Sequence, residues 1–109
     1  MPGPTVESLE KLIGTPRDGA LLRYSLGVEY SKIGNMAKAI DYLRDAVSKD
    51  PAYSAAWRSL GKTLEKEERS AEALEAYRCG IAAAQKKGDK QAEKEMTVFA
   101  RRIEKRTSA

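Results

Sequence analysis

Histidine is absent from this sequence, and cysteine occurs only once, as Cys79. The chain therefore lacks the residue that most often serves as a general base and as a metal ligand. A single cysteine cannot form a disulfide within the chain, which fits a reducing compartment. We expect neither a metal nor another cofactor.

Long apolar runs are also missing, although hydrophobic residues make up 41% of the 109 positions. That fraction is too high for a disordered chain and ordinary for one globular domain. No stretch reaches the length of a membrane span, and Met1-Pro2-Gly3-Pro4 lacks the basic start and apolar run of a signal peptide. We therefore expect a cytoplasmic protein that does not bind membranes.

Patterns typical of active sites are missing as well. The glycines Gly27, Gly61 and Gly80 fall far apart inside expected helices, so they form no phosphate-binding loop. Charged residues make up 33% of the chain, with both signs interleaved and a net charge of +4, which is typical of a solvated helical surface. No set of nucleophile and base stands out, and we expect no catalytic residues.

An internal repeat is the main positive feature. A shift of 34 residues places Ser25-Leu26-Gly27 on Ser59-Leu60-Gly61. The same shift pairs further identical residues: Lys32 with Lys66, Ala37 with Ala71, Ala39 with Ala73, and Arg44 with Arg78. A period of this length, made of two helical patterns, is typical of a helix-turn-helix solenoid whose units pack on their neighbours.

Helix start and stop signals divide the repeat into helices. Thr15-Pro16 and Asp50-Pro51 each combine an N-cap residue with a proline suited to the first helical position. Further N-caps stand at Asn35, Ser70 and Asp89, and glycines that can end a helix stand at Gly34 and Gly88. The expected helices cover residues 16–33, 36–49, 51–67, 70–87 and 89–105.

The matched positions resemble the tetratricopeptide repeat (TPR). In the unit 54–87 the resemblance rests on Trp57-x2-Leu60-Gly61, Ala73, Tyr77 and Gly80. In the unit 20–53 it rests on Leu26-Gly27-x2-Tyr30, Ala39, Leu43, Ala46 and Pro51. The first unit departs from the pattern by having Arg23 at the phase of Trp57, and the second lacks the terminal proline, with Gln85 there.

The same phase extends to both ends of the chain. Leu9, Leu12 and Ile13 suit the second helix of a preceding unit over residues 5–13. Ala92, Met96, Phe99 and Ile103 suit the first helix of a following unit over residues 89–105, shifted by one residue. We therefore expect one all-α domain over residues 1–109, a TPR-type solenoid of two full repeats flanked by a half-repeat helix at each end. It would be a small, stand-alone member of bacterial origin.

The resemblance implies a concave groove, lined by the first helix of each unit, that holds a peptide or a partner's helix. The groove phases fall on Tyr24, Val28 and Lys32, on Ala55, Arg58, Lys62 and Lys66, and, with the one-residue shift, on Glu93, Thr97 and Arg101. Arg58, Lys62 and Lys66 share one helix face by their spacing alone, and a merely solvated face explains them equally well. Trp57, Tyr30, Tyr77 and Phe99 we assign to the core.

The sequence thus predicts a non-enzymatic adaptor whose groove binds a protein or peptide segment, with acidic segments favoured by the basic residues. An alternative is a homo-oligomerising scaffold that associates through its end faces, because Val98 lies off the main apolar stripe. Nucleic-acid binding through Arg101, Arg102, Lys105 and Arg106 is least favoured. Glu104 interrupts that cluster, and basic residues also suit a helix C-terminus.

Overall fold

A computed structural model describes residues 5–108, which form six α-helices and no strand. The helices are α1 (Val6–Glu10), α2 (Ala20–Lys32), α3 (Met36–Lys49), α4 (Ser54–Lys66), α5 (Ser70–Lys87) and α6 (Lys90–Thr107). No helix among the described residues is both long enough and apolar enough to cross a bilayer. The segment Met1-Pro2-Gly3-Pro4, used above in the argument about a signal peptide, lies outside the described residues.

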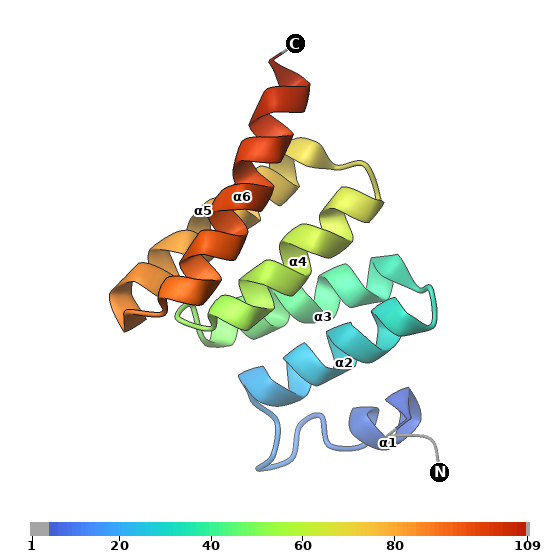
Figure 1. Ribbon diagram of the computed structural model, residues 1–109. Helices are drawn as coiled ribbons and strands as arrows, with labels where there is room; N and C mark the ends of the chain where they lie inside the picture. The colour runs from blue at the N-terminus through green and yellow to red at the C-terminus, as the bar shows by residue number, and fades with distance from the viewer. Residues whose placement is uncertain (1–4, 109) are drawn as a thin grey trace.

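The helices form two layers (Figure 1). α2 packs along α3, α4 along α5, and α5 along α6, while α4 contacts both α2 and α6. In Figure 1, α2, α4 and α6 lie toward the viewer, and α3 and α5 lie behind them. The all-helical, TPR-type architecture predicted from the 34-residue period is confirmed.

Close helix packing explains why glycine recurs at the same phase. A Cβ atom built on Gly27 would lie 2.5 Å from Cγ of Leu43, and one built on Gly61 would overlap the ring of Tyr77. Within each unit the second helix therefore seats a large side chain on the bare backbone of the first. Leu43 and Tyr77 are completely buried as a result.

The buried residues form two adjoining clusters. The larger one spans α3 to α6 and includes the completely buried Met96 and Ile103 of the last helix. The smaller one centres on Leu22, Leu26 and Tyr30 of α2, and the N-terminal residues Leu9, Leu12 and Ile13 pack against it. Residues of both flanking segments therefore pack with the core of the two repeats.

Most of the predicted helix ends agree with the structure. The side chain of Asn35 accepts a hydrogen bond from the amide of Lys38, and that of Asp89 accepts one from the amide of Ala92. Gly34 and Gly88 have positive φ angles of 84° and 73°, which end the preceding helices. At Ser70 the expectation differs by one residue, because Arg69 holds the N-cap position and has no side-chain capping bond.

The prediction that Thr15-Pro16 and Asp50-Pro51 start helices was wrong. The amide of Arg17 donates to Oγ1 of Thr15, and the amide of Ala52 donates to Oδ1 of Asp50. Each pair therefore builds a turn before the helix, and α2 and α4 begin at Ala20 and Ser54 rather than at residues 16 and 51. The N-terminal helix is also shorter than the expected 5–13, because residues 11–14 form turns.

Arg23, which replaces the tryptophan of the other unit, fastens the segment before α2. Its guanidinium donates two 2.9 Å hydrogen bonds to Asp18 and one of 2.8 Å to Asp45. Asp18 also accepts a bond from the amide of Gly14, and its side chain is only 11% exposed. These charge-assisted bonds hold the pKa of Asp18 far below its usual range.

Candidate functional site

A groove of about 170 Å³ runs between α2 and α4 on the layer that faces the viewer in Figure 1. It is lined by Val28, Ser31 and Lys32 from α2 and by Ser59, Lys62 and Lys66 from α4. Four of the predicted groove residues (Val28, Lys32, Lys62 and Lys66) therefore come together around one hollow. The helical spacing of four residues turns Lys62 and Lys66 to the same face.

The chemistry of this groove is basic with a small apolar patch. Its lining contains three lysines and no carboxylate. Nζ of Lys32 lies 3.3 Å from Glu29, and Nζ of Lys62 lies 5.0 Å from the centre of the Phe99 ring. Lys66 takes part in none of the ion pairs among residues 5–108. The lysines of the groove therefore have few existing contacts that a carboxylate would have to displace.

Arg58 lies in a separate hollow of about 200 Å³ between α4 and α6, together with Ala55. Its guanidinium forms a 2.9 Å ion pair with Glu95, and both side chains are 36% exposed. The predicted basic row of Arg58, Lys62 and Lys66 is therefore split between two hollows. Arg58 is already paired with Glu95 of α6.

The two remaining predicted residues lie apart from the lysine groove. The ring of Tyr24 packs against that of Tyr53 with 5.0 Å between centroids. Burial raises the pKa of Tyr53, and the neighbouring Tyr24 hydroxyl raises it further. Arg101 is exposed on α6 and lines neither hollow. A partner-binding role for all seven residues stays a prediction.

The α6 residues that face α4 are different from those extrapolated from the period. Glu95 contacts Arg58, and the Phe99 ring is contacted by Lys62 of α4. The guanidinium carbon of Arg102 lies 5.7 Å from the centroid of the same ring. Glu93 instead accepts a 3.1 Å hydrogen bond from Gln85 of α5. One residue of uncertainty in the shift rotates a helix by about 100°, so sequence phase could not place these side chains.

Two of the predicted core aromatics are fully covered and two are not. Tyr30 and Tyr77 are 5% and 0% exposed. Trp57 and Phe99 are half-buried and pack at the edge of the core. Trp57 also lines a hollow on the surface of the molecule, which its assignment to the core does not predict.

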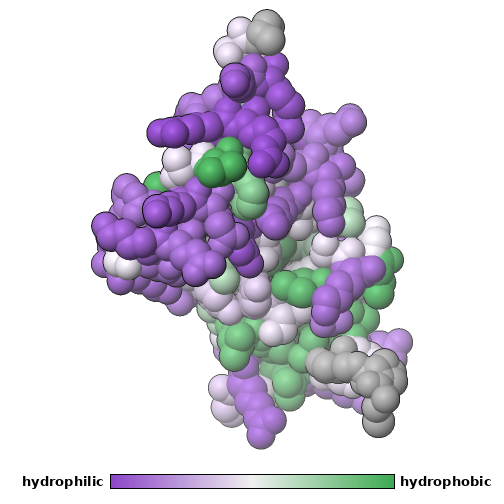
Figure 2. All heavy atoms as spheres, in the orientation of Figure 1, coloured by the Kyte–Doolittle hydropathy of each residue, from purple (hydrophilic) through white to green (hydrophobic). Residues whose placement is uncertain are grey.

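Other kinds of site find little support among the described residues. Residues 5–108 contain no group of three or more cysteine, aspartate or glutamate side chains arranged to hold a metal ion. Within the basic cluster of α6, Arg106 forms a 3.2 Å ion pair with Glu65, and Arg102 lies over Phe99. Figure 2 shows hydrophilic side chains covering the α5–α6 end, while apolar side chains gather toward α1 and α2.

Comparison with known proteins places the chain among helical repeat proteins. Residues 18–104 match the family model of the Bacterial transcriptional activator domain, a related helical repeat. A TPR repeat-containing protein of Pseudomonas aeruginosa is 44% identical over 100 residues, covering 92% of this chain and 95% of the relative.

Solved structures agree with that placement. A protein of Bordetella parapertussis, known from its solution structure, has a TM-score of 0.78 and 41% identity, covering 94% of this chain and 90% of its own. A TPR domain protein of Salinibacter ruber has a TM-score of 0.74 and 28% identity, covering 80% of this chain and 97% of its own. TPR proteins are generally protein-interaction modules and are typically not enzymes. The chain therefore belongs to the TPR proteins and carries, over residues 18–104, the related bacterial transcriptional activator domain.

Proposed function

We propose that this protein is a non-enzymatic adaptor that binds an acidic, extended segment of a partner protein in the groove between α2 and α4. The observation that supports the proposal is the lining of that groove, which contains Lys32, Lys62 and Lys66 together with the apolar Val28 and no carboxylate. A short apolar side chain would rest on Val28, and carboxylates on either side of it would meet the lysines.

The lysines are available at small free-energy cost. The ion pair of Lys32 with Glu29 is exposed, and such pairs contribute about 0–1 kcal/mol. The contact of Lys62 with Phe99 is worth about 0.5–1 kcal/mol at an exposed site. A carboxylate of the partner replaces these contacts with attractions of similar size from several lysines at once. Binding would therefore weaken strongly as salt concentration rises.

The test begins with selection from a library of random peptides displayed against the wild-type protein. Selected peptides are expected to be rich in aspartate and glutamate and to shift the NMR signals of Val28 and Lys66. The double variant Lys62→Glu with Lys66→Glu should bind them at least about tenfold more weakly, because two attractions become repulsions. The variant Lys90→Glu with Lys94→Glu, which makes the same charge change at exposed positions of α6, should bind as the wild type does.

Two results would count against the proposal. One is selection of peptides without an excess of acidic residues. The other is equal affinity of the Lys62→Glu, Lys66→Glu protein and its α6 control for the same peptides, with both proteins shown to be folded by circular dichroism.

Self-association is the second candidate, favoured by one observation. The apolar side chain of Val98 on α6 is 52% exposed. If Val98 is a contact between copies, light scattering should show a mass that rises with concentration, and Val98→Lys should abolish the rise. A constant monomer mass over the whole concentration range would remove this candidate.

A further inference from the structure

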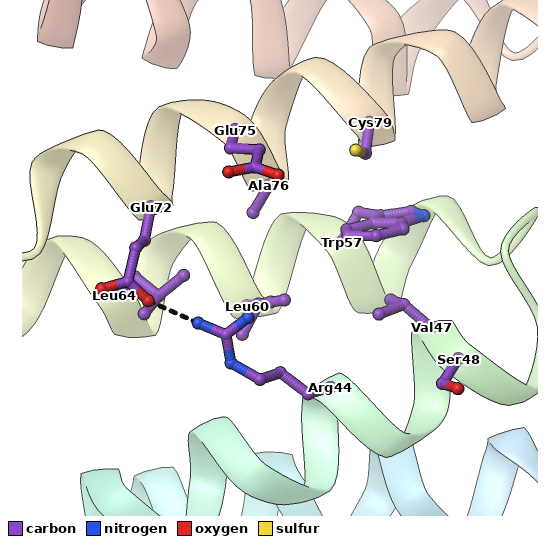
Figure 3. A pocket seen from close by; sticks show the side chains of 10 residues that line it. All are labelled: Arg44, Val47, Ser48, Trp57, Leu60, Leu64, Glu72, Glu75, Ala76 and Cys79. Carbon is purple, nitrogen blue, oxygen red and sulfur yellow. Dashed lines mark hydrogen bonds and ion pairs between the residues drawn. The ribbon is translucent and has the colours of Figure 1, made fainter.

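A second groove lies on the opposite side of α4, between α3 and α5 (Figure 3). It consists of two hollows of about 390 Å³ and 420 Å³, and the half-buried Trp57 and Cys79 line both of them. The two hollows therefore adjoin at these two residues, and together they are called the cleft below. None of the predicted groove residues on the lysine side lines it.

The cleft exists because α3 and α5 do not pack on each other. No Cα atom of α3 lies within 8 Å of one in α5. In the middle of the cleft the α5 side chains are small, namely Ala76, Cys79 and Ala83, and charged residues of α5 stand only toward its two ends. The inner wall is formed by Trp57, Leu60 and Leu64. Small residues on one wall and a large aromatic ring on another leave room for a segment of chain to lie against apolar surface.

The length of the cleft matches a short helix. Its lining along α5 runs from Glu72 to Lys86. At about 1.5 Å per residue this distance is roughly 20 Å, or about four helical turns. An amphipathic helix of that length could set large apolar residues, spaced three and four apart, into the cleft beside Trp57.

The charges at one end of the cleft indicate which charge a bound helix would carry there. Glu75 is exposed and has no ion-pair or hydrogen-bond partner among residues 5–108. The neighbouring Glu72 is already shared by Arg44, at 2.6 Å, and Arg69, at 2.8 Å. Figure 3 shows the Arg44–Glu72 pair reaching across from α3 to α5, with Glu75 further along α5. The other end has Asp50 and Lys86, which balance each other in charge.

We propose that this cleft binds a short amphipathic helix of a partner protein, apolar on one face and carrying a lysine or arginine that meets Glu75. The ring of Trp57 is the main apolar contact. The Arg44–Glu72 pair is about half exposed on both sides, and such pairs add little stability, so the arriving helix displaces it easily. The cleft is separate from the lysine groove, and its role does not depend on the function proposed above.

Trp57 is the only tryptophan in the sequence, so its fluorescence reports directly on the cleft. The probes are two synthetic helical peptides without tryptophan. They share one leucine-rich face, and differ only in having lysine or glutamate at the position that meets Glu75. The lysine peptide should shift the Trp57 emission in a saturable way. The glutamate peptide should bind at least about fivefold more weakly, because it places a like charge beside Glu75.

Variants separate this cleft from the rest of the surface. Glu75→Lys should reverse the preference between the two peptides, whereas Glu67→Lys, an exposed reversal beyond the end of α4, should leave it unchanged. The variant Lys62→Glu with Lys66→Glu should also bind the lysine peptide normally, so failure of one groove is distinguishable from failure of the other.

Three results would overturn the proposal. The first is an unchanged Trp57 emission with both peptides, and the second is equal affinity for the two. The third is an emission that shifts with the concentration of the protein alone, together with a rising mass in light scattering. That result would mean that a second copy of this chain covers the cleft.

Discussion

The hydroxyl of Tyr77 on α5 donates a 2.6 Å hydrogen bond to Glu65 on α4. The side chain of Tyr77 is completely buried, and its ring lies against the backbone of Gly61. Burial, followed by the bond to Glu65, raises the pKa of Tyr77 well above its ordinary value. One side chain therefore joins the two helices of the second unit through both packing and a hydrogen bond.

Gly61→Ala should destabilise the protein. The added methyl group would overlap the Tyr77 ring, which is enclosed and cannot move away. Overpacking costs about 1–3 kcal/mol, and it outweighs the gain of about 1 kcal/mol from replacing a helical glycine by alanine. Urea denaturation should show the loss. Gly19→Ala, at a glycine with open space around it, tests only the N-cap preference of α2, so it should cost less than Gly61→Ala. A Gly61→Ala protein as stable as the wild type would contradict this packing.

Tyr77→Phe should lower the free energy of unfolding by about 1 kcal/mol, because it removes the hydrogen bond and keeps the ring. Tyr53→Phe is the matched control, since the Tyr53 hydroxyl has no hydrogen-bond partner within residues 5–108. Denaturant titration of both variants measures the difference. Equal effects of the two changes would show that the Tyr77–Glu65 bond adds nothing to stability.

The bonds around Asp18 should make the protein sensitive to acid. Because the pKa of Asp18 is lowered in the folded state, its contribution to stability is fully present above the unfolded-state value of about 3.9. That contribution is lost as the pH falls further toward the folded-state pKa. The wild type should therefore be more stable than Asp18→Asn by a constant amount near neutral pH, and the difference should shrink below about pH 4.

Asp41→Asn, at an exposed position on α3, serves as the control for this pH experiment. Thermal unfolding followed by circular dichroism across the pH range is sufficient to measure both variants. A wild-type advantage that does not change between neutral and acidic pH would argue against the role of Asp18.

The Cys79 thiol should react slowly with disulfide reagents. Burial raises its pKa above the ordinary value, and the negative charge of Glu75 raises it further. Only the thiolate attacks a disulfide, so the midpoint of the rate against pH should lie above that of the urea-unfolded chain. Glu75→Gln should lower the midpoint, and the lysine peptide, once bound, should protect Cys79. A midpoint at or below that of the unfolded chain would contradict the environment described for this thiol.

The repeat could be predicted from the sequence because its packing requires particular residue types at fixed positions. Gly27 and Gly61 recur where a large residue of the neighbouring helix needs bare backbone, and the sequence shows this as identity at a fixed period. Asn35 and Asp89 cap helices through bonds to amides three residues ahead, which is a local interaction that sequence spacing reveals.

Other features could not be predicted, because the sequence is compatible with more than one local structure or helix rotation. Thr15-Pro16 and Asp50-Pro51 suit both the start of a helix and a turn before it, and in both places the turn forms. Arg58 pairs with Glu95 only because of the rotation of α6, which the repeat period does not determine. The cleft beside Trp57 depends on the separation of α3 and α5, so a half-exposed ring looked like a core residue.

The position of α4 between two grooves has a consequence for how this protein can evolve. Leu60 and Leu64 line the cleft, and Lys62 and Lys66 line the opposite groove, because residues two apart point to opposite sides of a helix. If both proposed grooves bind partners, a mutation at Lys62 or Lys66 would change what one face recognises while the other face keeps its shape. The two proposed specificities would then be inherited and altered independently, although one helix carries both.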